Sequence, residues 1–433
     1  MLYGDQLVAR ASLWLRFGTR RLPVAKCFAV VMSIIDHIRR YQEDLSAIRQ
    51  DLHANPELGL AEYRTATRVA EMLEAWGIEV HRGVGGTGVV GVLRNGNGPH
   101  TVGLRADLDA LPIVEANDLP YRSRKPGVMH ACGHDGHTTM LLGAARYLAE
   151  TRNFNGAICF IFQPGEEGVG GALAMLRDGL FERFPCDEVF ALHNRPGLPI
   201  GQYAITPGPA MSGGAFFDIV VTGRGSHGAR PEESIDPVLA ACHIATALQS
   251  VIARNVPPME TGVLSVTRVT AGDAYNVIPQ SATISGTARA FKSAVMTLIE
   301  TQMKRIAEGV AAGFGATAEV NFRLIFAPLV NEPILSEFCA DTAAELVGED
   351  NVNRNKPPAM GSEDFSFMLE QVPGAYMVIG NGTEGGQLHN PHYNFNDEAT
   401  PFGAAVLARL AERKLAPPAL DEHPPEPSGM IAP

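Results

Sequence analysis

The chain has 433 residues, more than one hydrophobic core usually supports, so we expect two domains, one of them interrupted by the other. Apolar residues make up 45% and charged residues 19% of the sequence, which is typical of a folded globular protein and excludes a disordered or collagen-like chain. Thirty-five Lys and Arg residues against 47 Asp and Glu residues give a net charge of −12, so nucleic acid and anionic membranes are not expected partners.

The two ends differ from the rest of the chain. Residues 1–31 form a basic N-terminal arm that reads either as a transit-like segment or, as we favour, as upstream sequence before a domain that starts at Met32. The apolar run 27–35 is too short to cross a bilayer, so no spanning helix is expected. The Pro- and Glu-rich tail, 417–433, is expected to be disordered. Six cysteines without regular spacing favour a reducing compartment, and we expect the cytoplasm.

Helices and strands alternate through the first part of the main domain, 32–212. Apolar periodicity predicts helices over 34–56, 60–76, 137–152 and 170–179, and strands over 87–94, 100–107, 156–163 and 187–194. This alternation predicts an α/β fold in which a mainly parallel sheet carries helices on both faces.

The order of predicted strands and helices changes at Gly213. From there to Phe326 the predicted order is strand, helix, two strands, helix, strand, which is the βαββαβ order of a ferredoxin-like unit. We therefore expect an inserted domain over 213–326. A helix over 334–348 and a strand over 375–381 then resume the alternation, so 327–416 should complete the main domain.

Side chains of the types that bind metals follow the predicted strands. Because the carboxyl ends of parallel strands share one edge of a sheet, segments that are far apart in sequence can converge there. The candidates are Asp107, Cys132, His134, Glu166, Glu167, His193 and His389.

The motif HACGHDGH (130–137) carries three histidines and a cysteine within eight residues. Gly133 and Gly136 should relax the backbone around them, an arrangement that is unfavourable unless something binds there. A closed structural zinc site is the alternative, but such sites usually use paired C-x-x-C ligands, and this sequence has none. We therefore favour Cys132 and His134 as ligands of a catalytic metal. His193 alone would more often be a structural histidine.

Two adjacent carboxylates, Glu166 and Glu167, follow Pro164 and Gly165 at the end of an apolar strand. Adjacent side chains leave a strand in different directions, so one can bind a metal while the other takes a proton from the attacking water. One ligand and one base are the minimum for metal-assisted hydrolysis. A solvated acidic turn is the alternative, and it is less attractive directly after a buried strand.

Taken together, the motifs resemble a known family. They are LHANPELGLAEYRT (52–65), GLRADLDALPI (103–113), MHACGHDGHT (129–138), FQPGEEG (162–168), HGARP (227–231), AYNVIP (274–279), GTARAF (286–291), GSEDFS (361–366) and LHNPHYNFND (388–397). From about residue 40 to 412 the sequence is similar to the aminoacylase and hippurate hydrolase branch of the metal-dependent amidohydrolases, which also includes carboxypeptidase-like and auxin-conjugate hydrolases.

This resemblance implies a site for two divalent metals in the main domain. Glu166 would be the general acid and base, and Asp107, Glu363 and Asp364 would support the site from behind the ligands. His130, His137 and His392 are left as structural or supporting residues, and Arg105 stands where the wider superfamily has a metal-binding histidine. The implied ligands are Cys132, which would bridge the metals, His134, Glu167, His193 and His389.

The same resemblance implies roles for the inserted domain. It would dimerise, giving a homodimer or a dimer of dimers. His227 would reach the neighbouring subunit's site and stabilise the oxyanion, and Asn276 and Arg289 would bind the carbonyl and the carboxylate of the substrate. The alternative is that residues at such positions have no functional role and are an ordinary turn residue at the end of a strand or an ordinary surface charge.

The expected function is hydrolysis of an N-acyl amino acid, hippurate-like, to a carboxylic acid and a free amino acid. A thiolate ligand suits Zn, whereas the oxygen and imidazole ligands would also accept Mn, Co or Ni. The alternatives are an N-acetyl-amino-acid or N-acetyl-diaminopimelate deacetylase, a dipeptidase, and an inactive binding protein of the same fold. The intact Glu166 argues against an inactive protein, because a binding protein has no use for a base beside its metals.

Overall fold

The computed structural model describes residues 32–416, so the predictions for 1–31 and for 417–433 lie outside the described residues. The larger sheet has eight strands in the order β1-β2-β4-β3-β5-β16-β6-β15. Strands from both sides of the segment 213–326 share this sheet, so the late part of the chain completes it. The strands are β1 Glu79–Val84, β2 Gly88–Asn95, β3 Thr101–Asp107, β4 Gly156–Gln163, β5 Glu188–Arg195, β6 Tyr203–Ala204, β15 Val352–Asn353 and β16 Gly374–Gly380.

The central strands of this sheet run parallel. β3 pairs in parallel with both β4 and β5, and β5 pairs in parallel with β16, so the carboxyl ends of all four meet at one edge. The pairs β1–β2, β2–β4 and β16–β6 are antiparallel, which makes the sheet mixed. The predicted α/β class with a mainly parallel sheet is confirmed, although β1 was not among the predicted strands.

Helices cover both faces of the sheet, as predicted. Successive side chains of a strand point to opposite faces, so Phe160 of β4 packs into one core while its neighbours Cys159 and Ile161 pack into the other. The helices α3, α4, α10 and α12 contribute to the first core, and α5, α6 and α11 contribute to the second. The helices of this domain are α1 Ile34–Arg39, α2 Gln42–Ala54, α3 Tyr63–Ala75, α4 His134–Thr151, α5 Gly171–Arg177, α6 Leu180–Arg183, α10 Pro333–Val347, α11 Phe365–Leu369 and α12 Thr400–Lys414.

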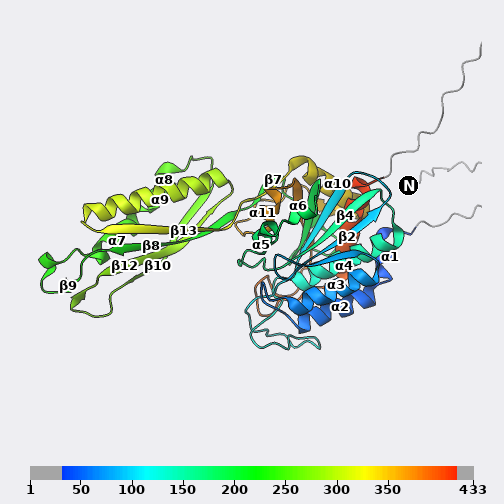
Figure 1. Ribbon diagram of the computed structural model, residues 1–433, viewed down its shortest axis with the longest axis horizontal. Helices are drawn as coiled ribbons and strands as arrows, with labels where there is room; N and C mark the ends of the chain where they lie inside the picture. The colour runs from blue at the N-terminus through cyan, green and yellow to red at the C-terminus, as the bar shows by residue number, and fades with distance from the viewer. Residues whose placement is uncertain (1–31, 417–433) are drawn as a thin grey trace, which may run out of the picture. The chain divides into compact units, whose positions relative to one another are not determined.

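The inserted domain has its own four-stranded antiparallel sheet in the order β10-β12-β8-β13. The order of elements along the chain and the order of strands in the sheet are those of the predicted ferredoxin-like unit. Three helices pack on one face of the sheet and enclose a separate core (Figure 1). The elements are β8 Gly213–Thr222, α7 Pro237–Ala247, α8 Gln249–Asn255, β10 Gly262–Ala271, β12 Ser281–Ala290, α9 Ser293–Gly313 and β13 Thr317–Phe326.

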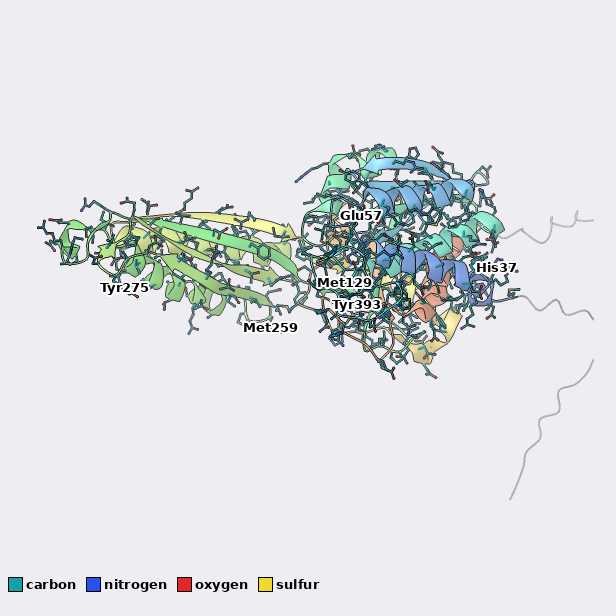
Figure 2. All side chains as sticks on the ribbon, turned by 90° about the horizontal axis from the view of Figure 1, so that it is seen from below. His37, Glu57, Met129, Met259, Tyr275 and Tyr393 are labelled. Atoms are coloured by element: carbon teal, nitrogen blue, oxygen red, sulfur yellow. The ribbon has the colours of Figure 1, made fainter. Side chains whose placement is uncertain are left out.

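Apolar side chains lie exposed on the inserted domain. On β8, Phe217 and Ile219 are buried under the helices, whereas Phe216 and Val220 on the opposite face are 47% and 41% exposed. Figure 2 shows Met259 and Tyr275 projecting from connecting segments of the same domain. An antiparallel sheet with one covered face can leave its other face for solvent or for a partner.

One segment of the inserted domain is long and apolar enough to cross a membrane by length and composition. The segment Pro237–Asn255 has a mean hydropathy of 1.2 over its best window, of which 33% is buried. It consists of two helices, α7 and α8, which join at Leu248, and Ala240, Ile244, Leu248 and Val251 pack into the core of the inserted domain. Packing in that core accounts for these four residues, whereas Leu239 of the same segment is 48% exposed.

Two predicted helix boundaries were wrong. The helix predicted over 34–56 is divided into α1 and α2, and the junction residue Tyr41 is buried with its hydroxyl donating to Glu150. The helix predicted to begin at His137 begins at His134, after Gly133 in the left-handed conformation. This earlier start places His134 in the first turn of α4, at the edge of the sheet where the parallel strands end.

Candidate metal centre and active site

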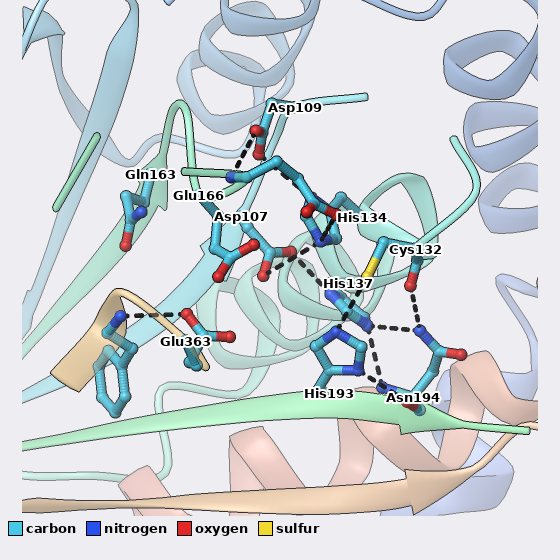
Figure 3. A network of polar contacts seen from close by, with 12 residues as sticks. Asp107, Asp109, Cys132, His134, His137, Gln163, Glu166, His193, Asn194 and Glu363 are labelled. Atoms are coloured by element: carbon cyan, nitrogen blue, oxygen red, sulfur yellow. Dashed lines mark hydrogen bonds and ion pairs between the residues drawn. The ribbon is translucent and has the colours of Figure 1, made fainter. Parts of the chain in front are cut away.

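A cavity of about 530 Å³ opens at the carboxyl edge of the parallel strands. Most of the predicted site residues of the main domain line it or lie directly behind it (Figure 3). β3 leads to Asp107, β4 to Glu166 and Glu167, and β5 carries His193 near its end. The lining residues that sequence analysis proposed are Cys132, Glu166, Glu167, His193, Arg289, Glu363 and His389.

The structure brings all five predicted ligands together. Potential ligand atoms of Cys132, His134 and His193 lie within 4.8 Å of one another, as do those of Cys132, Glu167 and His389. Cys132 belongs to both groups, which is the arrangement expected of a bridging ligand. Its sulfur lies 3.5 Å from Nε2 of His193.

Hydrogen bonds fix which ring nitrogen of each histidine faces the site. Nδ1 of His134 is 3.1 Å from the carboxylate of Asp109, and Nδ1 of His193 is 2.7 Å from the carbonyl oxygen of Asn194. Because these oxygens can only accept, Nδ1 donates in both rings, which leaves Nε2 as the nitrogen that would bind a metal. Burial lowers the pKa of His193 well below its usual value, which also favours the neutral ring that a metal requires.

Two buried polar atoms in this cluster lack hydrogen-bond partners among the described residues. They are Nε2 of His134 and Oε1 of Glu167, which lie 3.9 Å apart. A ring nitrogen without a hydrogen-bond partner is unfavourable when buried unless a cation binds it. The same oxygen of Glu167 lies 3.2 Å from Nε2 of His389. The donor set therefore fits divalent metal ions.

Local backbone geometry helps to place the ligands. His389 has φ of 63°, a conformation that non-glycine residues rarely adopt, and its N–H donates to the carbonyl oxygen of Ala131 at 2.8 Å. Gly133 has φ of 92°, and a Cβ there would lie 2.3 Å from the hydroxyl of Tyr393. Gly136 does not relax the backbone as expected. It is helical, and a Cβ would lie 2.3 Å from the ring of Phe395.

Asp109 was missed by sequence analysis, although it lies two residues after Asp107 in the same loop. One of its oxygens accepts from His134, and the other accepts from the backbone N–H of Glu167 at 3.0 Å. A single buried carboxylate thus orients one proposed ligand and fixes the position of another. The D-x-D spacing directly after a strand was the available signal.

Asp107 and Glu363 lie around a buried arginine behind the ligands. Arg105 donates to Asp107 and to Glu363, both at 2.9 Å. Asp107 also accepts from Nδ1 of His137 at 2.7 Å, and Nε2 of His137 accepts from the backbone N–H of Asn194 at 2.9 Å. Arg105 therefore neutralises the carboxylates behind the site, and both ring nitrogens of His137 are already used.

Two further histidines lie outside the ligand cluster. His130 is buried, both of its ring nitrogens lack a hydrogen-bond partner among the described residues, and burial lowers its pKa to about 4. His392 is exposed. Neither is among the side chains that could hold a metal within residues 32–416.

Glu166 is 6% exposed and lies beside the proposed ligands. Its carboxylate approaches His134 and Glu167 on one side and Glu363 and Asp364 on the other. Burial, together with the negative charges of Glu363 and Glu167, raises the pKa of Glu166 well above its usual value. A carboxylate with a raised pKa holds a transferred proton more readily, as a general base must.

Glu62 was also missed, and it anchors the loop that carries the two glutamates. It is fully buried, and its Oε1 accepts from the backbone N–H of Gly165 at 2.8 Å and from that of Leu60 at 3.0 Å. Its Oε2 accepts from the hydroxyl of Thr87. The segment NPELGLAE (55–62) therefore supports the loop after β4.

We expect Glu62→Ala to lower the free energy of unfolding by about 3 kcal/mol, because it leaves several buried donors unpaired. Glu62→Gln is the matched control. Its amide oxygen can accept from both N–H groups, and its amide nitrogen can donate to Thr87, so most of the stability should remain. Urea unfolding of both variants measures the free energy of unfolding. An equal decrease in both variants would show that these hydrogen bonds do not stabilise the loop.

The predicted residues of the inserted domain lie in two places. His227 is exposed on β9 (Ser226–His227), which pairs with β11 (Val277–Ile278), and the N–H of Gly228 donates to the carbonyl oxygen of Asn276 at 2.7 Å. His227 and Asn276 are thus neighbours, but within the described chain neither lines the cavity. Arg289 of β12 does line it, and its guanidinium donates to the hydroxyl of Ser362.

Comparisons with known proteins agree with this geometry. A profile of the peptidase family M20/M25/M40 matches residues 103–413. A hippurate hydrolase of Campylobacter jejuni is 44% identical over 384 residues, which are 89% of this chain and 100% of that protein. The IAA-amino acid hydrolase ILR1-like 4 of Arabidopsis thaliana is 37% identical, over 85% of this chain and 85% of that protein.

A solved structure has the same fold. The YXEP protein of Bacillus subtilis, described as a dinuclear metal-binding peptidase of the M20 family, is 33% identical with a TM-score of 0.76. The match covers 87% of this chain and 99% of that one. The predicted resemblance is confirmed, since the profile covers most of the chain and a relative spanned over its full length is 44% identical. This chain belongs to peptidase family M20/M25/M40 and is a hydrolase of amide bonds.

Proposed function

We propose that the protein hydrolyses N-acyl amino acids of the hippurate type, giving a carboxylic acid and a free amino acid. The observation that carries this proposal is the gathering of five potential ligands with Glu166 beside them. The five are Cys132, His134, Glu167, His193 and His389. The relatives named as a hippurate hydrolase and an IAA-amino acid hydrolase support the same substrate class.

The five ligands would hold two divalent metal ions, with Cys132 between them. The thiolate favours Zn, and the oxygen and imidazole ligands would accept Mn, Co or Ni. When bound, such ions activate water and polarise a carbonyl group. The remaining steps belong to side chains of the protein.

Glu166 would move the proton. Its carboxylate takes a proton from the attacking water and passes it to the nitrogen of the leaving amine, which allows the carbon–nitrogen bond to break. The surrounding charges suit this exchange, because the raised pKa of Glu166 lets it hold the proton between the two transfers. Arg105 keeps the nearby carboxylates of Asp107 and Glu363 paired.

The inserted domain would complete the site in a dimer. We assign His227 to the oxyanion in the neighbouring subunit's cavity, Asn276 to the substrate carbonyl and Arg289 to the substrate carboxylate. The exposure of His227 and the adjacency of Asn276 support a role outside their own cavity. The uncovered face of the inserted sheet, with Phe216 and Val220 exposed, offers apolar surface to a second copy.

Cys132→Ala should lose bound metal, because it removes the proposed bridging thiolate. Cys339→Ala is the matched control, since Cys339 is equally buried but lies in the apolar core on α10. We expect the control to keep its metal content, measured by elemental mass spectrometry on purified protein. Equal metal loss from both variants would mean that destabilisation, and not ligation, explains the result.

The proposed activity is tested by a panel of substrates assayed with added Zn, Mn, Co or Ni. The panel contains N-benzoylglycine, N-acetyl amino acids, N-acetyl-diaminopimelate and dipeptides. We expect kcat/KM to be highest for an N-acyl amino acid with a large acyl group. Highest turnover of the acetylated compounds or of the dipeptides would replace the proposal by a deacetylase or a dipeptidase.

A further inference from the structure

The active-site cavity holds more positive charge than a hippurate-like substrate needs. Such a substrate has one carboxylate, for which Arg289 is the proposed partner. Arg195 and Lys356, both in the main domain, line the same cavity as Cys132 and His193. The acidic residues of the lining are Glu166, Glu167 and Glu363, and all three belong to the metal centre or its support.

Neither of these two cations has an acidic partner. No carboxylate within residues 32–416 forms an ion pair with Arg195 or Lys356, and Nζ of Lys356 only approaches the carbonyl oxygen of Pro357 at 3.4 Å. Lys356 is half-buried, and burial together with the neighbouring Arg195 lowers its pKa. Two like charges near each other in a partly enclosed cavity repel, and a bound anion would relieve that repulsion.

Backbone hydrogen bonds fix the main chain at both residues. Arg195 ends β5 opposite Gly380 of β16, and its carbonyl oxygen accepts from the N–H of Asn381 at 3.1 Å. The N–H of Lys356 donates to the carbonyl oxygen of Ile205 at 3.1 Å, and its carbonyl oxygen accepts from the hydroxyl of Thr206 at 2.7 Å. Both side chains therefore leave from fixed backbone positions at the wall of the cavity.

We propose that the preferred substrates are N-acyl amino acids with a second carboxylate, and that Arg195 and Lys356 bind that second carboxylate. The proposal rests on the proposed function and narrows its substrate class. The second carboxylate could come from the side chain of the amino acid or from the acyl group. Both sources present the same chemistry to the two cations.

The test compares substrates that differ only in this charge. On the amino-acid side the pair is N-benzoylglutamate and N-benzoylglutamine, and on the acyl side it is N-succinylglycine and its terminal amide. We expect kcat/KM to favour the dicarboxylate by about tenfold or more in one of the two pairs, the effect of a charge-assisted contact. The pair that shows the preference identifies the source of the carboxylate. Absence of a preference in both pairs overturns the proposal.

Variants then tie the preference to the two side chains. Arg195→Gln and Lys356→Gln should each reduce the preference for the dicarboxylate toward about twofold or less. Lys304→Gln is the control, because Lys304 lies on α9 of the inserted domain and pairs with Glu300 at 2.6 Å. It should keep the full preference. An equal loss of kcat/KM for both substrates of a pair would show that the two cations bind the carboxylate that both substrates share. That result contradicts the proposal.

The outcome separates this inference from the function on which it rests. Hydrolysis of N-benzoylglycine without any preference for a second carboxylate refutes the inference alone. Failure to hydrolyse every N-acyl amino acid tested, with metal bound, refutes the proposed function and the inference together.

Discussion

Glu166→Gln should lower kcat by about 10² to 10⁴-fold while metal content stays close to that of the wild type. The amide keeps the shape of the side chain but cannot accept the proton of the attacking water. The buried position of Glu166 beside His134 and Glu167, with its raised pKa, is the physical basis of this expectation. Steady-state kinetics on N-benzoylglycine and elemental mass spectrometry of the same preparation check it.

Glu167→Gln is the matched variant, because the two residues are adjacent and carry the same functional group. Oε1 of Glu167 is buried without a hydrogen-bond partner and lies 3.2 Å from His389, so this change should deplete metal. If Glu166→Gln loses metal and Glu167→Gln retains it with low kcat, the two roles must be exchanged.

A statistical mixture of His227→Ala and Glu166→Gln chains should recover about a quarter of wild-type activity, although each variant alone should be nearly inactive. On the proposal, His227 serves the partner's cavity, so one site of a mixed dimer receives an intact Glu166 from one chain and an intact His227 from the other. Statistical mixing makes about half of the dimers hybrid, and each hybrid has one working site of two. The measurement is the activity of the whole dimer population after co-expression of two differently tagged chains, and hybrids isolated by tandem purification should reach about half of wild-type activity.

Two results would contradict this arrangement. Purified mixed dimers without recovered activity would show that His227 acts within its own chain or not at all. A monomeric wild-type protein with full activity, established by light scattering at assay concentrations, would exclude any contribution from a partner.

Strand order and chemistry made much of the site predictable from the sequence. Parallel pairing carries Asp107, Glu166 and His193 to one edge of the sheet, and that pairing follows from the alternation of apolar strands and helices. The ferredoxin-like order of the inserted domain was equally visible, because its four main strands have 10 residues each and α9 has 21. Both expectations depend on local patterns that determine the fold.

Other features depend on contacts that no local pattern reveals. Asp109 and Glu62 matter because they meet Glu167 and Gly165, which lie 58 and 103 positions away in the sequence. Tyr41, at the junction of α1 and α2, donates its hydroxyl to the distant side chain of Glu150. Contacts of this kind arise only when the chain folds, so a pattern of apolar residues cannot show them.

The central claim is that bound divalent metal carries the hydrolysis, and removal and return of the metal tests it most directly. Protein treated with a strong chelator and then freed of it should contain no metal and hydrolyse no N-benzoylglycine, and two equivalents of Zn, Mn, Co or Ni per chain should restore activity. Nε2 of His134, which has no hydrogen-bond partner among the described residues, and Oε1 of Glu167 are among the atoms that would bind those ions. Full turnover by protein shown to be metal-free would contradict the account.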